Sequence, residues 1–281
     1  MKIGCHCVLF AGSLAQEPRV VMENMKAAGA LGVEMGARFL TPDSARPVLD
    51  ALEGNGLELA GYHVGAPLGM LCDGFEGVQK MIAAGVEFLQ GRPVRNIIFS
   101  GLSSKRPEDN GKVFDERLLD DKFLEQVGAG FERLADYAAG YDVTLNYHNH
   151  MDEFKDGARL FRALARCAPS MKLAVDLGWA AAGGMDVPAL LREFAPRISY
   201  VHLRDFNAAE MNAAATFEEK SESYRNLGEG DFFDASLLEL LGTILGEDDW
   251  AVVEYEKGEK DPLRYKNAVA LLKTMQRESS G

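Results

Sequence analysis

The side chains best suited to proton transfer or metal binding are concentrated between residues 145 and 154, in the stretch LNYHNHMDEF. His148 and His150 stand on either side of Asn149, and two acidic residues follow within the same stretch. The whole chain has five histidines, so two of them fall within these few positions. Imidazole and carboxylate groups at this spacing are compatible with a metal site, an acid/base site or a polar patch on an ordinary strand. The elements that position the stretch decide between these interpretations.

Eight short apolar runs of strand type alternate with segments of helical periodicity. The runs are residues 2–9, 31–36, 57–64, 95–100, 142–148, 171–177, 198–203 and 250–255. Helical periodicity is clearest at 18–30, 117–140, 156–168, 186–195 and 233–245. Parallel strands need crossover helices, so the alternation predicts an α/β fold with a parallel sheet. Because no change in composition separates the units, we expect one (β/α)8 TIM-barrel domain over residues 1–281.

A doubly wound open sheet is the alternative fold. Such sheets often carry a Gly-x-Gly-x-x-Gly turn between a strand and a helix, where a dinucleotide binds. The glycines of residues 128–130 fall inside a helical pattern, and those of residues 228–230 precede a helix without a strand. We therefore expect no dinucleotide site, and the barrel remains the favoured fold.

Two connections between a strand and the following helix are long, at residues 101–116 and 204–231. In a TIM barrel these connections rise from the face that carries the active site. Connections of this length usually serve as lids or binding loops. We expect both to set substrate specificity.

The composition excludes several classes of partner. The net charge of −13 and the pI near 4.9 oppose binding to nucleic acid and favour a small neutral or weakly charged substrate. No segment resembles a signal peptide or a membrane-spanning helix, so we expect a cytoplasmic protein that does not contact membranes. Cys5 and Cys7 flank His6 and could form a metal clip, but alternation on a strand favours small core residues in a reducing compartment.

Polar side chains stand at the ends of six of the predicted strands, where a TIM barrel carries its catalytic residues. They are Glu34, His63, Asn146, His148, His150, Asp176, His202, Arg204, Glu254 and Glu256. Asp176 follows a wholly apolar run, where a carboxylate is costly unless it is paired or bound to a metal. The last four strands all end in side chains that can bind metal, which favours a divalent ion with mixed imidazole and carboxylate ligands.

Five segments of the chain resemble the xylose isomerase-like TIM-barrel superfamily, specifically its sugar phosphate isomerase/epimerase group. They are YHNHMDEF (147–154), VDLGWAAAGGMDVPALL (175–191), YVHLRDF (200–206), LGEGDFFD (227–234) and WAVVEYEKGEKDPL (250–263). The resemblance covers nearly the whole chain and implies an enzyme, a sugar or cyclitol isomerase or epimerase that works through an enediolate. Two alternatives stay open: a metal-dependent dehydratase or lyase acting on a keto-sugar or inosose, and a sugar-binding barrel without turnover.

The same resemblance implies one divalent ion, with manganese expected first and Co²⁺, Mg²⁺, Fe²⁺ or Zn²⁺ as alternatives. Relatives hold it with a Glu, an Asp, a His and a second Glu, of which the last three correspond to Asp176, His202 and Glu254. The position of the first Glu is Asn146 here, a weak ligand. We expect His148 to complete the metal site, with His150 as the alternative.

The resemblance also suggests catalytic roles. We expect Glu254 to be a ligand and a candidate base, and His148 or His150 to be the other acid/base group. Glu256 is expected to orient one of the metal-binding side chains without contacting the metal itself. Because one of the two carboxylates that flank the reacting carbon in epimerases is missing, a histidine replaces it or the reaction proceeds from one side only.

For the substrate, we expect contacts from Glu153 and Arg204, with His63 and Trp179 lining the pocket. Trp179 stands where many relatives have His, and it is better suited to stacking on a sugar face than to moving protons. The loop residues Lys105 and Arg106 could bind a phosphate, although exposed loop charges also explain them. The superfamily includes DNA endonucleases, but the acidic balance of this chain opposes that activity. The expected partner is a small sugar or polyol, and a homo-oligomer stays open.

Overall fold

The computed structural model describes residues 1–40, 42–102, 104–106, 111–113, 115–214 and 216–278. Eight strands form a closed barrel in the order β1-β12-β9-β8-β7-β4-β3-β2. They are β1 (Lys2–His6), β2 (Gly32–Gly36), β3 (Glu58–Pro67), β4 (Asn96–Leu102), β7 (Thr144–His148), β8 (Lys172–Asp176), β9 (Ile198–Leu203) and β12 (Trp250–Val253). Each of these strands falls on one of the predicted runs, and every barrel pair with a described register is parallel. The predicted TIM barrel is confirmed.

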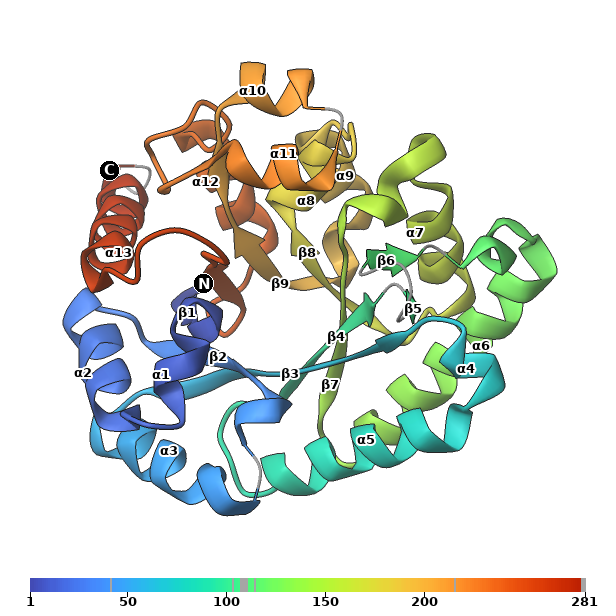
Figure 1. Ribbon diagram of the computed structural model, residues 1–281, viewed down its shortest axis with the longest axis horizontal. Helices are drawn as coiled ribbons and strands as arrows, with labels where there is room; N and C mark the ends of the chain where they lie inside the picture. Colours follow the sequence, from blue (N-terminus) through green and yellow to red (C-terminus); the bar gives the residue numbers. More distant parts are fainter. Residues whose placement is uncertain (41, 103, 107–110, 114, 215, 279–281) are drawn as a thin grey trace. The chain divides into compact units, whose positions relative to one another are not determined.

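Helices fill the connections between the strands (Figure 1). The α-helices are α1 (Ala11–Leu14), α2 (Pro18–Ala28), α3 (Pro42–Gly54), α4 (Met70–Asp73), α5 (Phe75–Leu89), α6 (Asp121–Ala139), α7 (Lys155–Cys167), α8 (Leu177–Ala182), α9 (Val187–Phe194), α10 (Ala208–Ala213), α11 (Phe217–Glu222), α12 (Ala235–Ile244) and α13 (Pro262–Glu278). The short 3-10 helices are η1 (Cys7–Phe10), η2 (Ala37–Phe39), η4 (Glu116–Leu119), η5 (Met151–Phe154) and η6 (Ala195–Arg197).

Aspartate caps fix where three of these helices begin. Asp120, Asp186 and Asp234 accept backbone N–H groups at the starts of α6, α9 and α12, at 2.8, 3.0 and 2.8 Å. A cap satisfies one of the amide donors that have no partner within the helix. The helical patterns predicted from residues 117, 186 and 233 therefore start as α-helix only after these aspartates.

Residues 1–60, 176–178 and 186–281 form one compact unit. Within it, β2, β1, β12 and β9 pair in that order. The last helix, α13, packs against α2, which joins the two ends of the chain (Figure 1). Tyr265 of α13 donates a hydrogen bond of 2.7 Å to the backbone carbonyl of His6, so the C-terminal helix is tied to the end of β1.

Residues 61–175 and 179–185 form the second compact unit. Its strands β3, β4, β7 and β8 pair in parallel, and α6 packs against α7. Phe99, Phe131 and Tyr147 make edge-to-face aromatic contacts in its core, with ring centroids 4.9 and 5.3 Å apart. Tyr147 directly precedes His148 in β7, so this aromatic core adjoins His148.

Both long connections contain secondary structure. The first carries the antiparallel pair β5 (Ser104–Arg106) and β6 (Gly111–Val113), and the side chains of Lys105 and Arg106 lie outside what the structure describes. The second carries α10, α11 and the antiparallel pair β10 (Asp205–Phe206) and β11 (Tyr224–Arg225). Among the described residues, none of the helices has the length and apolar character that a membrane crossing requires.

The four cysteines are free thiols. Cys5 and Cys7 are 0 % and 1 % exposed, which confirms the expectation that they are core residues. Cys7 leaves the strand and opens η1, because the Val8 N–H donates to the side chain of His6 and ends β1 there.

Candidate active site

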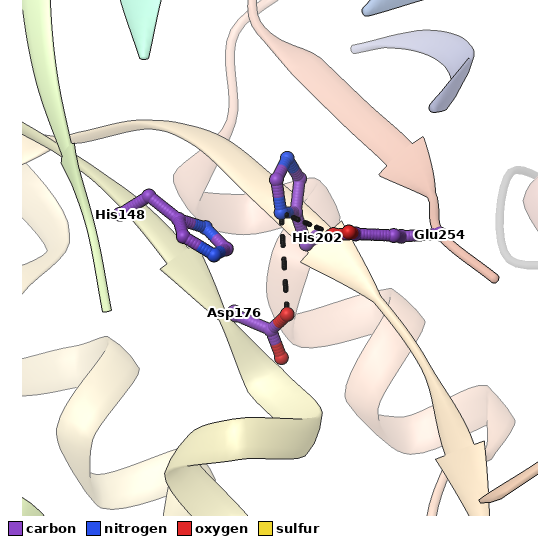
Figure 2. A group of neighbouring side chains, drawn as sticks. All are labelled: His148, Asp176, His202 and Glu254. Atoms are coloured by element: carbon purple, nitrogen blue, oxygen red, sulfur yellow. Dashed lines mark ion pairs between the residues drawn. The ribbon is translucent and has the colours of Figure 1, made fainter. Parts of the chain in front are cut away.

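Three of the predicted metal ligands converge at the ends of β8, β9 and β12 (Figure 2). His202 Nδ1 lies 2.8 Å from Glu254 Oε2 and 4.0 Å from Asp176 Oδ2. All three side chains are buried. A buried ring nitrogen between two carboxylates provides the nitrogen and oxygen donors that Mn²⁺, Fe²⁺, Co²⁺ and Zn²⁺ accept, so the donor set fits a divalent ion.

Arg204 contacts the same oxygen atoms of Asp176 and Glu254 that face His202. Its Nε donates to Asp176 Oδ2 at 2.6 Å, and its Nη2 lies 2.7 Å from Glu256 Oε1 and 3.0 Å from Glu254 Oε2. Gly178 makes room for this side chain, since a Cβ at that position would lie 2.8 Å from Arg204 Cβ. The structure therefore assigns Arg204 a role in holding the carboxylates, and its contact with substrate stays a prediction.

Glu34, one of the polar residues expected at strand ends but given no role there, also belongs to this cluster. Its Oε2 lies 2.6 Å from His202 Nε2 and 2.7 Å from the hydroxyl of Tyr200, and its Oε1 lies 3.1 Å from His6 Nε2. The signal in the sequence is a glutamate inside the strand GVEMG, where it is fully buried. A buried carboxylate is costly unless charged or hydrogen-bonding partners surround it.

The charges in the cluster reinforce one another. Burial raises the pKa of both the Glu34 and the Glu254 carboxyl. His202 and His6 nevertheless hold the pKa of Glu34 well below its ordinary value. Arg204, His6 and His202 have the same effect on the pKa of Glu254. Burial lowers the pKa of His202, yet Glu34 and Glu254 raise it well above its ordinary value. A metal ion binding at Nδ1 must therefore displace a proton.

His148, also labelled in Figure 2, ends β7 in the second unit. It is 1 % exposed, and its ring centroid lies 5.0 Å from that of the half-buried His150 and 5.4 Å from that of His63. The Nε2 atom of His63 lies 3.0 Å from Ser100 Oγ. The structure thus gathers three of the five histidines into one cluster.

Asn146, which we expected to stand at the position of the relatives' glutamate, is fully buried. Its amide nitrogen donates to Asn96 Oδ1 at 3.5 Å and to the Thr144 carbonyl at 3.4 Å. Both bonds link the side chain to neighbouring strand residues, which gives Asn146 a structural role in β7.

Glu153 and Trp179, expected to contact substrate, are 3 % and 1 % exposed. The two oxygens of Glu153 accept the Tyr147 hydroxyl at 2.8 Å and the His150 backbone N–H at 3.0 Å. Glu153 therefore fixes the turn that carries both histidines of LNYHNHMDEF. The substrate contacts of both residues remain predictions.

The burial of Glu153 predicts a pH-dependent stability. Burial raises the pKa of Glu153 to about 7, against the lowering effect of the Tyr147 hydrogen bond. The folded protein then holds a proton that the unfolded chain releases near pH 4.5, so stability is full below that pH and falls as the pH rises toward 7. The expected loss is about 3 kcal/mol. Urea unfolding at pH 5 and pH 8 should show this loss in the wild type and little of it in Glu153→Gln.

The control is Glu125→Gln at an exposed position of α6 in the same unit, and this variant should keep the wild-type pH dependence. If Glu153→Gln loses as much stability as the wild type over this range, the carboxyl of Glu153 is not the titrating group.

The segment LGEGDFFD has a structural role. The buried carboxylate of Asp205 accepts hydrogen bonds from the backbone N–H groups of Phe206, Gly228, Gly230, Phe232 and Phe233 at 2.9 to 3.1 Å. A Cβ on Gly230 would overlap the Asp205 carboxylate. This clamp holds the segment against the residue that directly follows Arg204.

A cavity of about 140 Å³ adjoins the cluster in the first unit. Its walls include Arg204, Glu254, Tyr224, Glu256 and Lys257. Residues of the second long connection around β11 line this cavity, and a role of this connection in specificity stays a prediction. Carboxylate, phenol and cationic groups together suit a ligand rich in hydroxyl groups.

Comparison with known proteins agrees with this picture. The family model described as xylose isomerase-like TIM barrel matches residues 22–275. An inosose dehydratase from Mesomycoplasma hyopneumoniae (strain 7448) is 24 % identical over 270 residues, covering 90 % of this chain and 87 % of that protein. An inosose dehydratase from Lactiplantibacillus plantarum is 25 % identical over 234 residues, covering 82 % of this chain and 72 % of that protein.

Among solved structures, the probable 3-DHS dehydratase of petrobactin synthesis from Bacillus anthracis superposes with a TM-score of 0.73. The match has 14 % sequence identity and covers 97 % of this chain and 99 % of that chain. At this identity the likeness shows a shared fold.

Proposed function

Because the chain belongs to the xylose isomerase-like TIM-barrel family, we propose that it is a divalent-metal-dependent enzyme acting on a keto-sugar or a cyclic keto-polyol of the inosose class. The observation that carries the proposal is the buried convergence of His202 Nδ1 with the carboxylates of Asp176 and Glu254. The sequence favoured isomerisation or epimerisation, with dehydration as the alternative. The relatives named inosose dehydratase move dehydration to first place.

His148 is the fourth ligand in this proposal. It pairs in register with Ala174 of β8, and Asp176 lies two residues further along that strand. Alternation places Ala174 and Asp176 on the same side of β8, so the register supports a common side for His148 and Asp176. His148, Asp176, His202 and Glu254 also make a set of four buried side chains of metal-binding type. Manganese is the expected ion, with Co²⁺, Mg²⁺, Fe²⁺ or Zn²⁺ as alternatives.

The charges of the cluster support a division of roles. A bound divalent ion would stabilise the negative charge that develops on the carbonyl oxygen of the substrate. Glu254 is a weak base, since Arg204, His6 and His202 hold its pKa well below the usual range, and this favours a role as ligand. His150 is the base, because it is half-buried and its backbone is fixed by Glu153.

A single histidine is sufficient for dehydration from one face. His150 takes the proton from the carbon next to the carbonyl, and the protonated ring then gives that proton to the hydroxyl leaving from the following carbon. One water departs, and a carbon–carbon double bond conjugated to the carbonyl remains. The replacement of the relatives' glutamate by Asn146 agrees with a reaction that uses one base.

The two histidines should separate in mutagenesis. His150→Ala is expected to keep its metal and to lose turnover by about 100-fold or more, as expected when a general base is removed. His148→Ala is expected to lower metal affinity. Chelator competition measures the metal, and the ultraviolet absorbance of the enone product measures turnover. Full turnover in His150→Ala would exclude it as the base, and wild-type metal affinity in His148→Ala would exclude it as a ligand.

The proposed function is tested with the chelated protein, an inosose and added Mn²⁺ in D₂O. The expected result is metal-dependent formation of the enone, with loss of one water. Deuterium uptake into recovered substrate without enone would replace dehydration by isomerisation or epimerisation. Neither exchange nor product from an inosose or a keto-sugar would contradict the proposal.

A further inference from the structure

Glu34 lies on the side of the His202 ring that faces away from Asp176 and Glu254. It contacts Nε2 at 2.6 Å, whereas Glu254 contacts Nδ1 at 2.8 Å. We infer that Glu34, supported by His6 and Tyr200, is a positioning residue that holds the ring hydrogen of His202 on Nε2 and directs Nδ1 to the ion. This inference rests on the metal site of the proposed function.

The hydrogen-bond direction at His6 can be read from its backbone contact. The Val8 N–H donates to His6 Nδ1 at 2.9 Å, so that nitrogen is an acceptor and carries no hydrogen. The hydrogen of the His6 ring therefore lies on Nε2 and is donated to Glu34 Oε1 at 3.1 Å.

Tyr200 supplies a second donor to the same carboxylate. Its hydroxyl lies 2.7 Å from Glu34 Oε2 and donates its hydrogen to that oxygen. With donors on both oxygens, Glu34 is an ionised acceptor. It then requires a hydrogen on His202 Nε2, the third group that faces it.

A hydrogen fixed on Nε2 leaves Nδ1 as the nitrogen that can bind a metal. Histidine ligands in proteins are commonly oriented in this way by a carboxylate on the other ring nitrogen, which also makes the ligand more basic. Glu34 itself stays behind the ring, with its oxygens directed to His6, Tyr200 and His202. Removing the Glu34 carboxylate should allow the His202 ring to reorient and its hydrogen to leave Nε2. All of the proposed metal ligands are kept in such a variant.

Glu34→Gln tests the inference on the full-length protein. The amide keeps the size of the side chain but can donate to Nε2, which favours the other tautomer. Zn²⁺ affinity, measured by chelator competition, should fall about 10- to 100-fold. In ¹⁵N spectra, where the five histidines can be resolved, the Nε2–H signal of His202 should be present in the wild type with and without Zn²⁺ and shifted or lost in the variant.

Glu34→Asp is the second variant, should Glu34→Gln not fold. It keeps the charge but withdraws the carboxylate by one methylene, so the same loss in Zn²⁺ affinity is expected to be smaller. A wild-type Zn²⁺ affinity together with an unchanged His202 signal in a folded Glu34 variant would overturn the inference. So would a metal-free wild type whose His202 carries no hydrogen on Nε2. Absence of Zn²⁺ binding by a wild type that shows this hydrogen would overturn the metal site while leaving the positioning intact.

Discussion

Asp176→Asn is expected to lose the divalent ion and turnover together. Asp176 Oδ2 lies 4.0 Å from His202 Nδ1, within reach of an ion bound to that nitrogen. The amide keeps the shape of the side chain but removes the negative charge that binds a cation. Mutating a residue that only hydrogen-bonds to a metal ligand costs about 10- to 100-fold in metal affinity. Because Asp176 is expected to be a ligand itself, we expect a loss of at least about 100-fold. Chelator competition and kcat/KM measured at saturating Mn²⁺ check the two effects.

Asp248→Asn is the matched control. Asp248 belongs to the same unit, its side chain is 97 % exposed, and its nearest cation is Lys2 at 3.6 Å. Metal affinity and turnover should stay at the wild-type level. If Asp176→Asn binds metal as tightly as this control, the ion is not bound at the end of β8.

Arg204→Met is expected to destabilise the metal-free protein strongly. Arg204 is 2 % exposed and bonds to the carboxylates of Asp176, Glu254 and Glu256. Removing one partner of a buried ion pair leaves uncompensated charge, at a cost of about 3–5 kcal/mol. A divalent ion should compensate part of this charge, so Mn²⁺ should stabilise the variant more than the wild type. Urea unfolding in chelator and in Mn²⁺ measures both effects.

The control for this variant is Arg46→Met. Arg46 pairs with Asp50 in the same unit, and the two side chains are 85 % and 55 % exposed. An exposed pair contributes less than about 1 kcal/mol, so this change should have a small effect that does not depend on Mn²⁺. Equal stability of Arg204→Met and Arg46→Met in chelator would contradict the role assigned to Arg204.

The barrel could be predicted because each of its strands is a short apolar run followed by a helical pattern. The residues at which individual strands end, and the short elements in the connections, could not be predicted. The run predicted at residues 2–9 stops at His6, because the Val8 N–H bonds to the side chain of that residue. The strands β10 and β11 are too short for a periodic pattern, and the Asp205 clamp joins residues up to 28 positions apart.

The site was partly predictable because several of its residues follow directly after predicted strands. Asp176, His202 and Glu254 stand at strand ends and match the family segments, so their convergence was expected. Glu34 was noted at a strand end, but its role could not be predicted because it depends on His202, which is 168 positions away in the chain. His6 was considered only with its neighbouring cysteines, since nothing local to the sequence links it to Glu34.

The most direct test of the metal centre is anomalous diffraction from crystals of the Mn²⁺-loaded protein. We predict one strong anomalous peak bonded to Asp176, Glu254 and the Nδ1 atom of His202, with Glu34 hydrogen-bonded to Nε2 of the same ring. The contact to His148, His150 or Asn146 would identify the remaining ligand. A protein without a peak at these three residues, or with its peak elsewhere, would contradict the metal centre.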